Sequence, residues 1–232
     1  MSRDQILANI RTSLHANRPQ LLAEATRAPH EPPPFVLPPQ GDLAEQFVIE
    51  LTRLEGKAYR VATAEDALDI IERLLEENQA SQVIGWDINQ IGLPGLSALL
   101  SARGVVPAVT NIRGDVRQSR LQELEPVPVC LSGVELAIAE SGTMLLRHGP
   151  GRPRLASLLA PCHIAIVFEH QLVRGLGEAL ALLAQRYGDE IFGPTSNLTF
   201  ITGPSRTADI EMTLSLGIHG PPQVHAILVG KG

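Results

Sequence analysis

The sequence predicts an α/β domain with a mixed, mainly parallel β-sheet flanked by helices, preceded by an N-terminal helical arm. After Gly41, short apolar segments alternate with amphipathic ones, as in successive β–α–β units. The strand segments are short and apolar, as expected where helices cover both faces of a parallel sheet. A length of 232 residues suits one such domain and is short for two.

Residues 1–39 are predicted to form the arm and a proline-rich linker, and residues 40–232 the α/β domain. Ile6, Leu7, Ile10 and Leu14 recur with helical spacing, which indicates a short amphipathic helix. The segment 29–39 holds six prolines and should be extended and irregular. The arm either folds back onto its own domain or docks on a second subunit or partner.

Helices and strands are expected to alternate over the first half of the domain. Thr63 can cap the second helix, with acidic residues in the following turn. The predicted helices cover 43–54, 63–76, 93–102 and 115–124, and the predicted strands cover 57–62, 82–85 and 105–109.

From Val127 the strands follow one another closely, with a turn or bulge at Ser141 and Gly142. Further strands are expected over 127–133, 135–141, 142–147, 163–168, 198–202 and 224–229, with helices over 155–159 and 177–187. Ordinary α/β spacing then gives a sheet of about seven or more strands.

The first candidate cluster is the segment 133–143, GVELAIAESGT, which runs from one strand into the next turn. Gly142 would let a ligand approach the backbone, and Ser141 and Thr143 offer hydroxyls. Glu140 and Glu135 are weak catalytic candidates, by analogy of fold alone. The alternative is that Glu135 is a solvated turn residue and Glu140 a charge at a strand end.

The second candidate cluster is the segment 201–211, ITGPSRTADIE. Gly203 ends a strand, and Ser205 or Thr207 would cap a following helix, whose free N–H groups can bind an anion. Arg206 adds a bidentate positive charge, and Asp209 would cap the helix or orient Arg206. The two clusters are expected to enclose an anion pocket at the carboxyl ends of strands. The alternative is an ordinary capped helix between two strands.

Other polar side chains have two interpretations each. His219 is a weak candidate for a general acid or base, or a turn histidine that bonds backbone carbonyls. Arg147, Arg152 and Arg154 surround a glycine-rich turn, where they either steer an anion or lie in a solvated loop. No residue spacing predicts a metal site.

The two clusters together resemble conserved blocks of the LUD-domain family, with GPSRTADIE followed by GIHGP as the stronger signature. The run AIAESGT and the Thr195-Ser196-Asn197 segment are also similar to that family. The resemblance covers about residues 44–229. It implies a fold related to the CoA-transferase, ribose-5-phosphate isomerase and formyltetrahydrofolate cyclo-ligase group. It also implies a role in L-lactate oxidation to pyruvate, with iron–sulfur proteins as partners.

Composition limits the possible partners and compartments. The formal charge of −6 argues against nucleic acid as a partner. The N-terminus lacks the apolar core of a signal peptide, and no long apolar run predicts a membrane span, so we expect a cytoplasmic protein. Two distant cysteines, Cys130 and Cys162, predict no disulfide framework and cannot supply the four thiolates of an iron–sulfur cluster. No cofactor is therefore expected in this chain.

Three functions are compatible with the sequence. Given the resemblance, the first is an accessory component of a lactate utilization system that binds a small anionic ligand or assembles with iron–sulfur partners. The second is an independent enzyme of the CoA-transferase or cyclo-ligase type, acting on an acyl, phosphosugar or folate-like substrate. The third is a ligand-binding scaffold without catalysis.

Overall fold

The structure is a computed structural model that describes residues 2–25, 41–110, 114–192, 197–208 and 214–230. The chain divides into two compact units, Met1–Phe35 and Val36–Gly232, which we describe separately. No helix within the described ranges is long and apolar enough to cross a bilayer.

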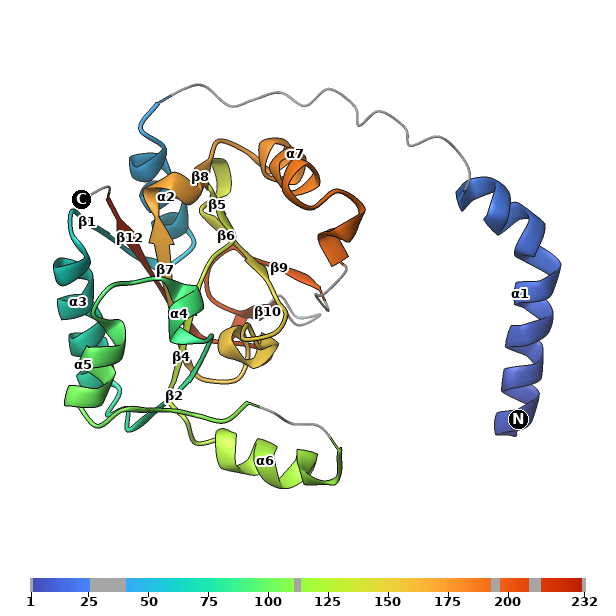
Figure 1. Cartoon of the computed structure of the whole chain (residues 1–232), viewed down its shortest axis with the longest axis horizontal. Coiled ribbons are helices and arrows are strands. Elements are labelled where there is room, and N and C mark those ends of the chain that lie inside the picture. The colour runs from blue at the N-terminus through green and yellow to red at the C-terminus, as the bar shows by residue number, and fades with distance from the viewer. Residues whose placement is uncertain (1, 26–40, 111–113, 193–196, 209–213, 231–232) are drawn as a thin grey trace. The chain divides into compact units, whose positions relative to one another are not determined.

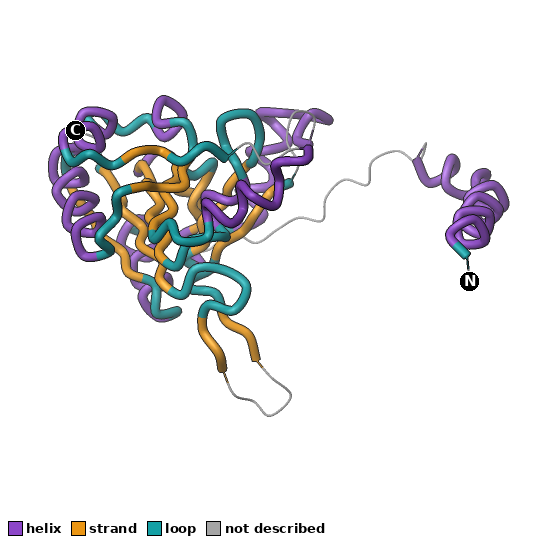
Figure 2. The backbone as a smooth tube through the Cα atoms, turned by 90° about the horizontal axis from the view of Figure 1, so that it is seen from below, coloured by secondary structure: helices purple, strands orange, loops and turns teal. Residues whose placement is uncertain are grey.

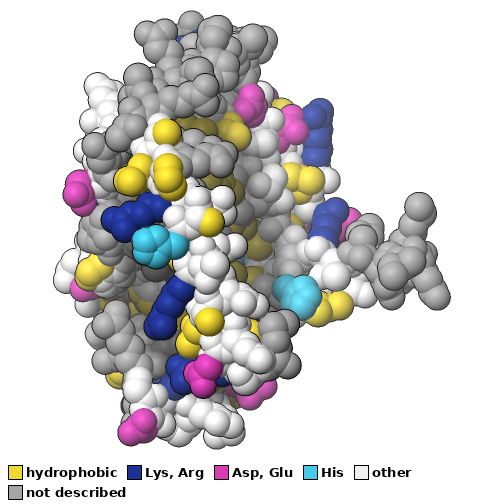
Figure 3. Space-filling model, turned by 90° about the vertical axis from the view of Figure 1, so that its right-hand side faces the viewer, with side chains coloured by type: hydrophobic (Ala, Val, Ile, Leu, Met, Phe, Trp, Pro, Cys, Tyr) yellow, Lys and Arg dark blue, Asp and Glu magenta, His cyan; other side chains and the backbone are white. Residues whose placement is uncertain are grey.

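The first unit holds helix α1, Arg3–Ala25, which is longer than the sequence predicts. Its predicted apolar stripe is exposed, with Ile10 at 48% and Leu14 at 56% of full accessibility. Figure 3 shows one face of the whole chain, where hydrophobic side chains lie among basic, acidic and histidine side chains. The proline-rich linker that the sequence predicts over 29–39 lies outside the described residues.

The second unit is built on a six-stranded, all-parallel sheet with the order β1-β12-β7-β4-β2-β3 (Figure 1). These strands are β1 (Lys57–Val61), β2 (Gln82–Gly85), β3 (Val106–Pro107), β4 (Val129–Gly133), β7 (Cys162–Phe168) and β12 (Gln223–Val229). The central strand β4 is buried along its whole length. The predicted α/β class with a mainly parallel sheet is confirmed.

The helices of the second unit lie close to the predicted positions, apart from the short helix α4, which the sequence does not predict. They are α2 (Leu43–Arg53), α3 (Ala64–Glu77), α4 (Ile88–Ile91), α5 (Leu96–Ala102), α6 (Arg117–Leu124) and α7 (Leu176–Tyr187). Asp42 caps α2, and Thr63 forms a capping box with Asp66 at the start of α3. Figure 1 shows α3 and α5 on one side of the parallel sheet and a second sheet on the other.

The second sheet has four strands in the order β8-β5-β6-β9, whereas the sequence suggests a single sheet. Its strands are β5 (Leu136–Ile138), β6 (Thr143–Arg147), β8 (Leu172–Val173) and β9 (Leu198–Ile201). Helix α7 packs on it around a small apolar cluster that includes Leu145 and Leu183. Strands β5 and β6 turn back on each other through Gly142, which adopts a left-handed conformation.

The helix start predicted after Gly203 is wrong. The segment forms an antiparallel hairpin of β10 (Arg206–Ala208) and β11 (Leu214–Leu216), which projects from the unit in Figure 2. Thr207 pairs with Ser215, so its backbone belongs to a ladder rather than to a first helical turn. The capping pattern is a local signal, and pairing with a later segment overrides it.

Gly142→Ala is expected to lower the free energy of unfolding by about 2–5 kcal/mol, from left-handed strain plus overpacking. A Cβ at Gly142, where φ is 60°, would lie 2.3 Å from the backbone nitrogen of Leu51 in α2. Gly104→Ala is the matched control, because Gly104 has a φ of 65° and no atom within 4 Å of the added Cβ. Urea unfolding should show a much smaller loss for the control, and equal losses would contradict the close packing on α2.

We expect a chain that starts at Gly41 to retain a cooperative thermal transition within a few degrees of the full chain. Every residue of the two buried apolar clusters lies between Ala44 and Val229, so the truncation removes none of them. Calorimetry of both chains provides the comparison. A non-cooperative melt of the shorter chain would show that the arm belongs to the folding unit.

Candidate ligand-binding site

The first predicted cluster forms a chain of hydroxyl groups. The Oγ of Ser141 lies 2.8 Å from Thr143 Oγ1, which lies 2.8 Å from Thr202 Oγ1. Thr202 directly follows β9 and belongs to the second predicted cluster, so the structure does bring parts of the two clusters together. The sequence does not predict this contact, because 59 residues separate Thr202 from Thr143.

Helix α2 covers both glycines of the predicted clusters. A Cβ on Gly142 would meet the backbone of Leu51, and a Cβ on Gly203 would lie 3.0 Å from the Cβ of Leu54. Each glycine lets another group come close to its backbone, and in this structure that group is the end of α2. A ligand-binding role for either glycine stays a prediction.

Arg206 also contacts the end of α2. Its Nη2 donates to the carbonyl oxygen of Leu54 at 2.5 Å and lies 3.0 Å from Glu55 Oε2. A guanidinium at the C-terminal end of a helix satisfies a free carbonyl and suits the helix dipole. Ser205 accepts from the backbone N–H of Gly217 through its carbonyl, which holds the base of the hairpin. Asp209 lies outside the described residues.

Glu140 lies at the start of α7. Its Oε1 accepts from the backbone N–H of Leu176 at 2.7 Å. A Cβ on Gly175 would lie 2.9 Å from the same oxygen, so the missing side chain makes room for the carboxylate. A negative charge at a helix N-terminus stabilises the helix.

Glu135 is buried in a charged cluster, which differs from the solvated turn residue that the sequence left open. Its Oε2 accepts from Arg152 Nη1 at 3.1 Å, and its Oε1 accepts from the Tyr187 hydroxyl at 2.7 Å and from Arg186 Nη1 at 3.3 Å. Burial, together with the hydrogen bond to Glu135, raises the pKa of the Tyr187 phenol. Tyr187 therefore stays protonated and donates to the carboxylate.

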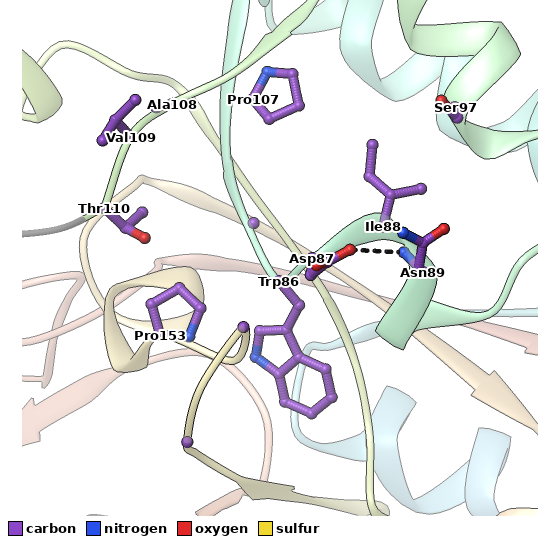
Figure 4. A pocket seen from close by; sticks show the side chains of 13 residues that line it. Trp86, Asp87, Ile88, Asn89, Ser97, Pro107, Ala108, Val109, Thr110 and Pro153 are labelled. Atoms are coloured by element: carbon purple, nitrogen blue, oxygen red, sulfur yellow. Dashed lines mark hydrogen bonds between the residues drawn. The ribbon is translucent and has the colours of Figure 1, made fainter.

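One pocket lies where the chain reverses the direction in which it adds strands to the parallel sheet. From β2 the chain continues to β3 at the sheet edge, and from β4 it eventually continues to β7 on the other side. Ligands of open α/β sheets bind outside the carboxyl ends of strands at such a point. A pocket of about 880 Å³ opens there, between the ends of β2 and β3 and a loop that includes Gly151 and Pro153 (Figure 4).

A smaller pocket of about 210 Å³ lies on the other side of the same loop. Its wall combines arginine, histidine, tyrosine and amide side chains, namely Arg147, His148, Arg152, Tyr187 and Gln90. Gly149 lines both pockets.

The smaller pocket has an excess of positive charge. Arg147 stacks on the Tyr187 ring at 3.9 Å and donates to the backbone carbonyls of Glu190 and Ile191. Within the described residues, no carboxylate lies within 4 Å of its guanidinium. Arg147 and Arg152 line this pocket, and the carboxylate that binds Arg152, that of Glu135, is shared with Arg186 outside the wall. The guanidinium of Arg147 is therefore available to an anion.

Arg152 connects the two pockets. Its guanidinium lies 4.9 Å from the ring centre of Trp86, which lines the larger pocket, and its Nε donates to Gln90 Oε1 at 2.7 Å. The indole Nε1–H of Trp86 is buried and has no acceptor among the described residues. Leaving such a donor without a partner costs about 1–3 kcal/mol.

The two histidines near these features differ. His148 is buried, its Nε2 lies 2.8 Å from Thr199 Oγ1, and burial lowers its pKa, so it is neutral at neutral pH. His219 is exposed between β11 and β12 and lines neither pocket. In the described part of the chain, no group of three His, Cys, Asp or Glu residues is arranged to hold a metal ion.

Sequence reasoning missed these two pockets, although it noted the arginines on either side of the turn. The signal that could have found the site is the density of arginines in residues 147–154. The arginines form a cluster only through contacts such as that between Glu135 and Arg186. These residues are 51 positions apart, so the sequence does not predict the contact.

Comparison with known proteins agrees with this architecture. A family model described as the LUD domain matches residues 44–229. A protein named lactate utilization protein C from Geobacillus sp. strain WCH70 is 28% identical, with 82% of this chain and 79% of the relative covered. One of the same name from Halalkalibacterium halodurans is 32% identical, with 75% and 72% covered.

A solved structure supports the fold. The crystal structure of a DUF162 family protein from Deinococcus radiodurans is 22% identical and has a TM-score of 0.58, with 83% of this chain and 100% of that chain covered. The match to the family model spans nearly the whole second unit. The chain therefore belongs to the LUD domain family.

Proposed function

We propose that this chain is a cytoplasmic accessory component of an L-lactate utilization system, in which it binds a small anionic ligand. The names of its relatives support the pathway. The observation that carries the binding role is the arginine-rich pocket of about 210 Å³ in a protein whose formal charge is −6.

The chemistry of this pocket suits a small carboxylate. A guanidinium binds a carboxylate through two parallel hydrogen bonds, and Arg147 has no competing carboxylate among the described residues. The amide N–H of Gln90 that does not bind Pro150 can donate to the hydroxyl or keto oxygen of a 2-hydroxy or 2-oxo acid. The Tyr187 oxygen, whose proton goes to Glu135, can accept from a hydroxyl group. Lactate and pyruvate are therefore the ligands to test first, with inorganic phosphate as a third anion.

Oxidation of lactate requires a redox centre, and we propose that iron–sulfur partner proteins supply it. Both cysteines of this chain are free and buried in neighbouring strands of the parallel sheet, away from any surface cluster site. Assembly with such partners, or delivery of the bound acid to them, is then the contribution of this chain.

The second candidate is an independent enzyme of the CoA-transferase or cyclo-ligase type. A glutamate nucleophile would first have to leave its present contacts. Both oxygens of Glu135 accept hydrogen bonds, and Glu140 binds the start of α7. These contacts favour the binding role.

Arg147→Gln is expected to weaken the binding of lactate, pyruvate or phosphate tenfold to a hundredfold, because a charged hydrogen bond contributes about 1.5–3 kcal/mol. Arg206→Gln is the matched control. It removes the contact with Leu54 and should lower stability while leaving affinity unchanged. Isothermal titration calorimetry distinguishes the two. Loss of affinity in Arg206→Gln alone would move the anion site to the hairpin.

Cells that lack this gene and any paralogue are expected to grow poorly on L-lactate as sole carbon source and normally on glucose. Wild-type protein should restore growth on lactate, and the Arg147→Gln protein should not if the pocket serves the pathway. The measurement is growth rate at equal protein abundance. Normal growth of the deletion strain on lactate would refute the proposed role.

A further inference from the structure

We infer that the smaller pocket selects 2-hydroxy acids over the corresponding 2-oxo acids, and that Tyr187 is the residue that distinguishes the two. The inference rests on the proposed anion site and deepens it. That site holds the carboxylate of the ligand, and Tyr187 determines whether the next carbon atom carries a hydroxyl or a keto oxygen. The pocket therefore holds lactate more tightly than pyruvate, its oxidised form.

Arg147 places the carboxylate of such an acid. Its Nε and Nη2 donate to the backbone carbonyls of Ile191 and Glu190, at 3.2 Å each. The end of the guanidinium keeps one N–H group on Nη1 and one on Nη2, in the parallel arrangement that binds both oxygens of a carboxylate. Because this guanidinium stacks on the Tyr187 ring at 3.9 Å, a carboxylate bound to it brings the substituent of the next carbon atom toward Tyr187.

The hydroxyl group of Tyr187 is an acceptor toward this substituent. Its hydrogen goes to Glu135 Oε1, at 2.7 Å, and the same carboxylate also accepts from Arg152 and Arg186. A phenol oxygen that donates its one hydrogen still has a lone pair for a second partner. Turning the hydrogen toward a keto oxygen would exchange a bond to a carboxylate for a weaker bond to a neutral acceptor.

The amide of Gln90 fits both kinds of acid, so it does not distinguish them. Its oxygen accepts from Arg152 Nε at 2.7 Å, and one of its hydrogens goes to the carbonyl of Pro150 at 3.0 Å. The second hydrogen can go to a hydroxyl or to a keto oxygen. A hydroxyl group can accept this hydrogen and donate its own to Tyr187. A keto oxygen has no hydrogen to donate, and its lone pairs repel those of the Tyr187 oxygen.

The size of the preference follows from the burial of Tyr187. A site that hydrogen-bonds a ligand hydroxyl rejects an analogue without that group, because a polar atom of the site then loses its partner. Tyr187 is only partly buried, so water can partly replace the ligand, and we expect a preference of roughly tenfold. The volume of about 210 Å³ lies below the range for drug-sized ligands, roughly 300–1,000 Å³, which suits a small acid.

The test compares two pairs of acids on the full-length protein. The pairs are L-lactate with pyruvate, and L-2-hydroxybutyrate with 2-oxobutyrate, each titrated while ¹H–¹⁵N spectra of the protein are recorded. Each hydroxy acid is expected to bind roughly tenfold more tightly than its oxo counterpart. The second pair shows whether the preference belongs to the class of acid or to lactate alone.

Tyr187→Phe tests the residue, and Tyr59→Phe is the matched control, because these are the two tyrosines of the chain. Phenylalanine keeps a ring for Arg147 to stack on and removes the acceptor oxygen. Tyr187→Phe should lower the affinity for each hydroxy acid to that for its oxo counterpart and leave the oxo acids nearly unchanged. Tyr59 lies 3.1 Å from His225 Nδ1 and outside the pocket wall, so its substitution should keep the preference.

The outcomes separate this inference from the proposed function. Equal affinities within each pair, or tighter binding of the oxo acids, would overturn the inference while the anion site stands, and this comparison needs no variant. A preference that survives Tyr187→Phe would also overturn it, as would an equal loss for both kinds of acid, which indicates a structural role. Absence of binding by all four acids would overturn the proposed function as well.

Discussion

The buried carboxylate of Glu135 joins the parts of the molecule that form the site. It follows β4 of the parallel sheet, and its partners come from the loop after β6, through Arg152, and from the end of α7, through Arg186 and Tyr187. Breaking one partner of a fully buried ion pair typically costs about 3–5 kcal/mol. Here the arginines are partly exposed, at 27% and 41%, so solvent screens each pair and the cost is smaller. The carboxylate thus links the parallel sheet, the second sheet and α7, which apolar packing also joins.

The same group shapes the electrostatics of the small pocket. The carboxylate of Glu135 holds both Arg152 and Arg186 in place. Its single negative charge does not neutralise the positive charges of these two residues and of Arg147. Arg147 is positioned by two backbone carbonyls and by the Tyr187 ring, which orient a guanidinium without cancelling its charge. Orientation and residual charge are the two properties that an anion site needs, and here the folding contacts themselves provide both.

The sequence predicts those features that depend on neighbouring residues. The capping box of Thr63 and Asp66 and the apolar strand 163–168 are local patterns, and the structure confirms both the helix and the strand. The helix expected after Gly203 depends on the same kind of local pattern and is wrong, because Thr207 pairs with Ser215 instead. A cap motif states which residues can begin a helix, whereas pairing with a distant segment decides whether they do.

The candidate site shows the same limit in another form. A glutamate, a tyrosine and several arginines are visible in the sequence, but their meaning depends on contacts across 17 to 52 residues. The local sequence does not distinguish an arginine in a solvated loop from an arginine in an anion pocket. For Arg152, the contact with Glu135 makes the distinction. For Gly142 the sequence suggests room for a ligand next to the backbone. In the structure the backbone of α2 occupies that space. A glycine and a charged residue thus indicate close approach and polarity, while the tertiary fold determines whether the approaching group is a ligand or the chain itself.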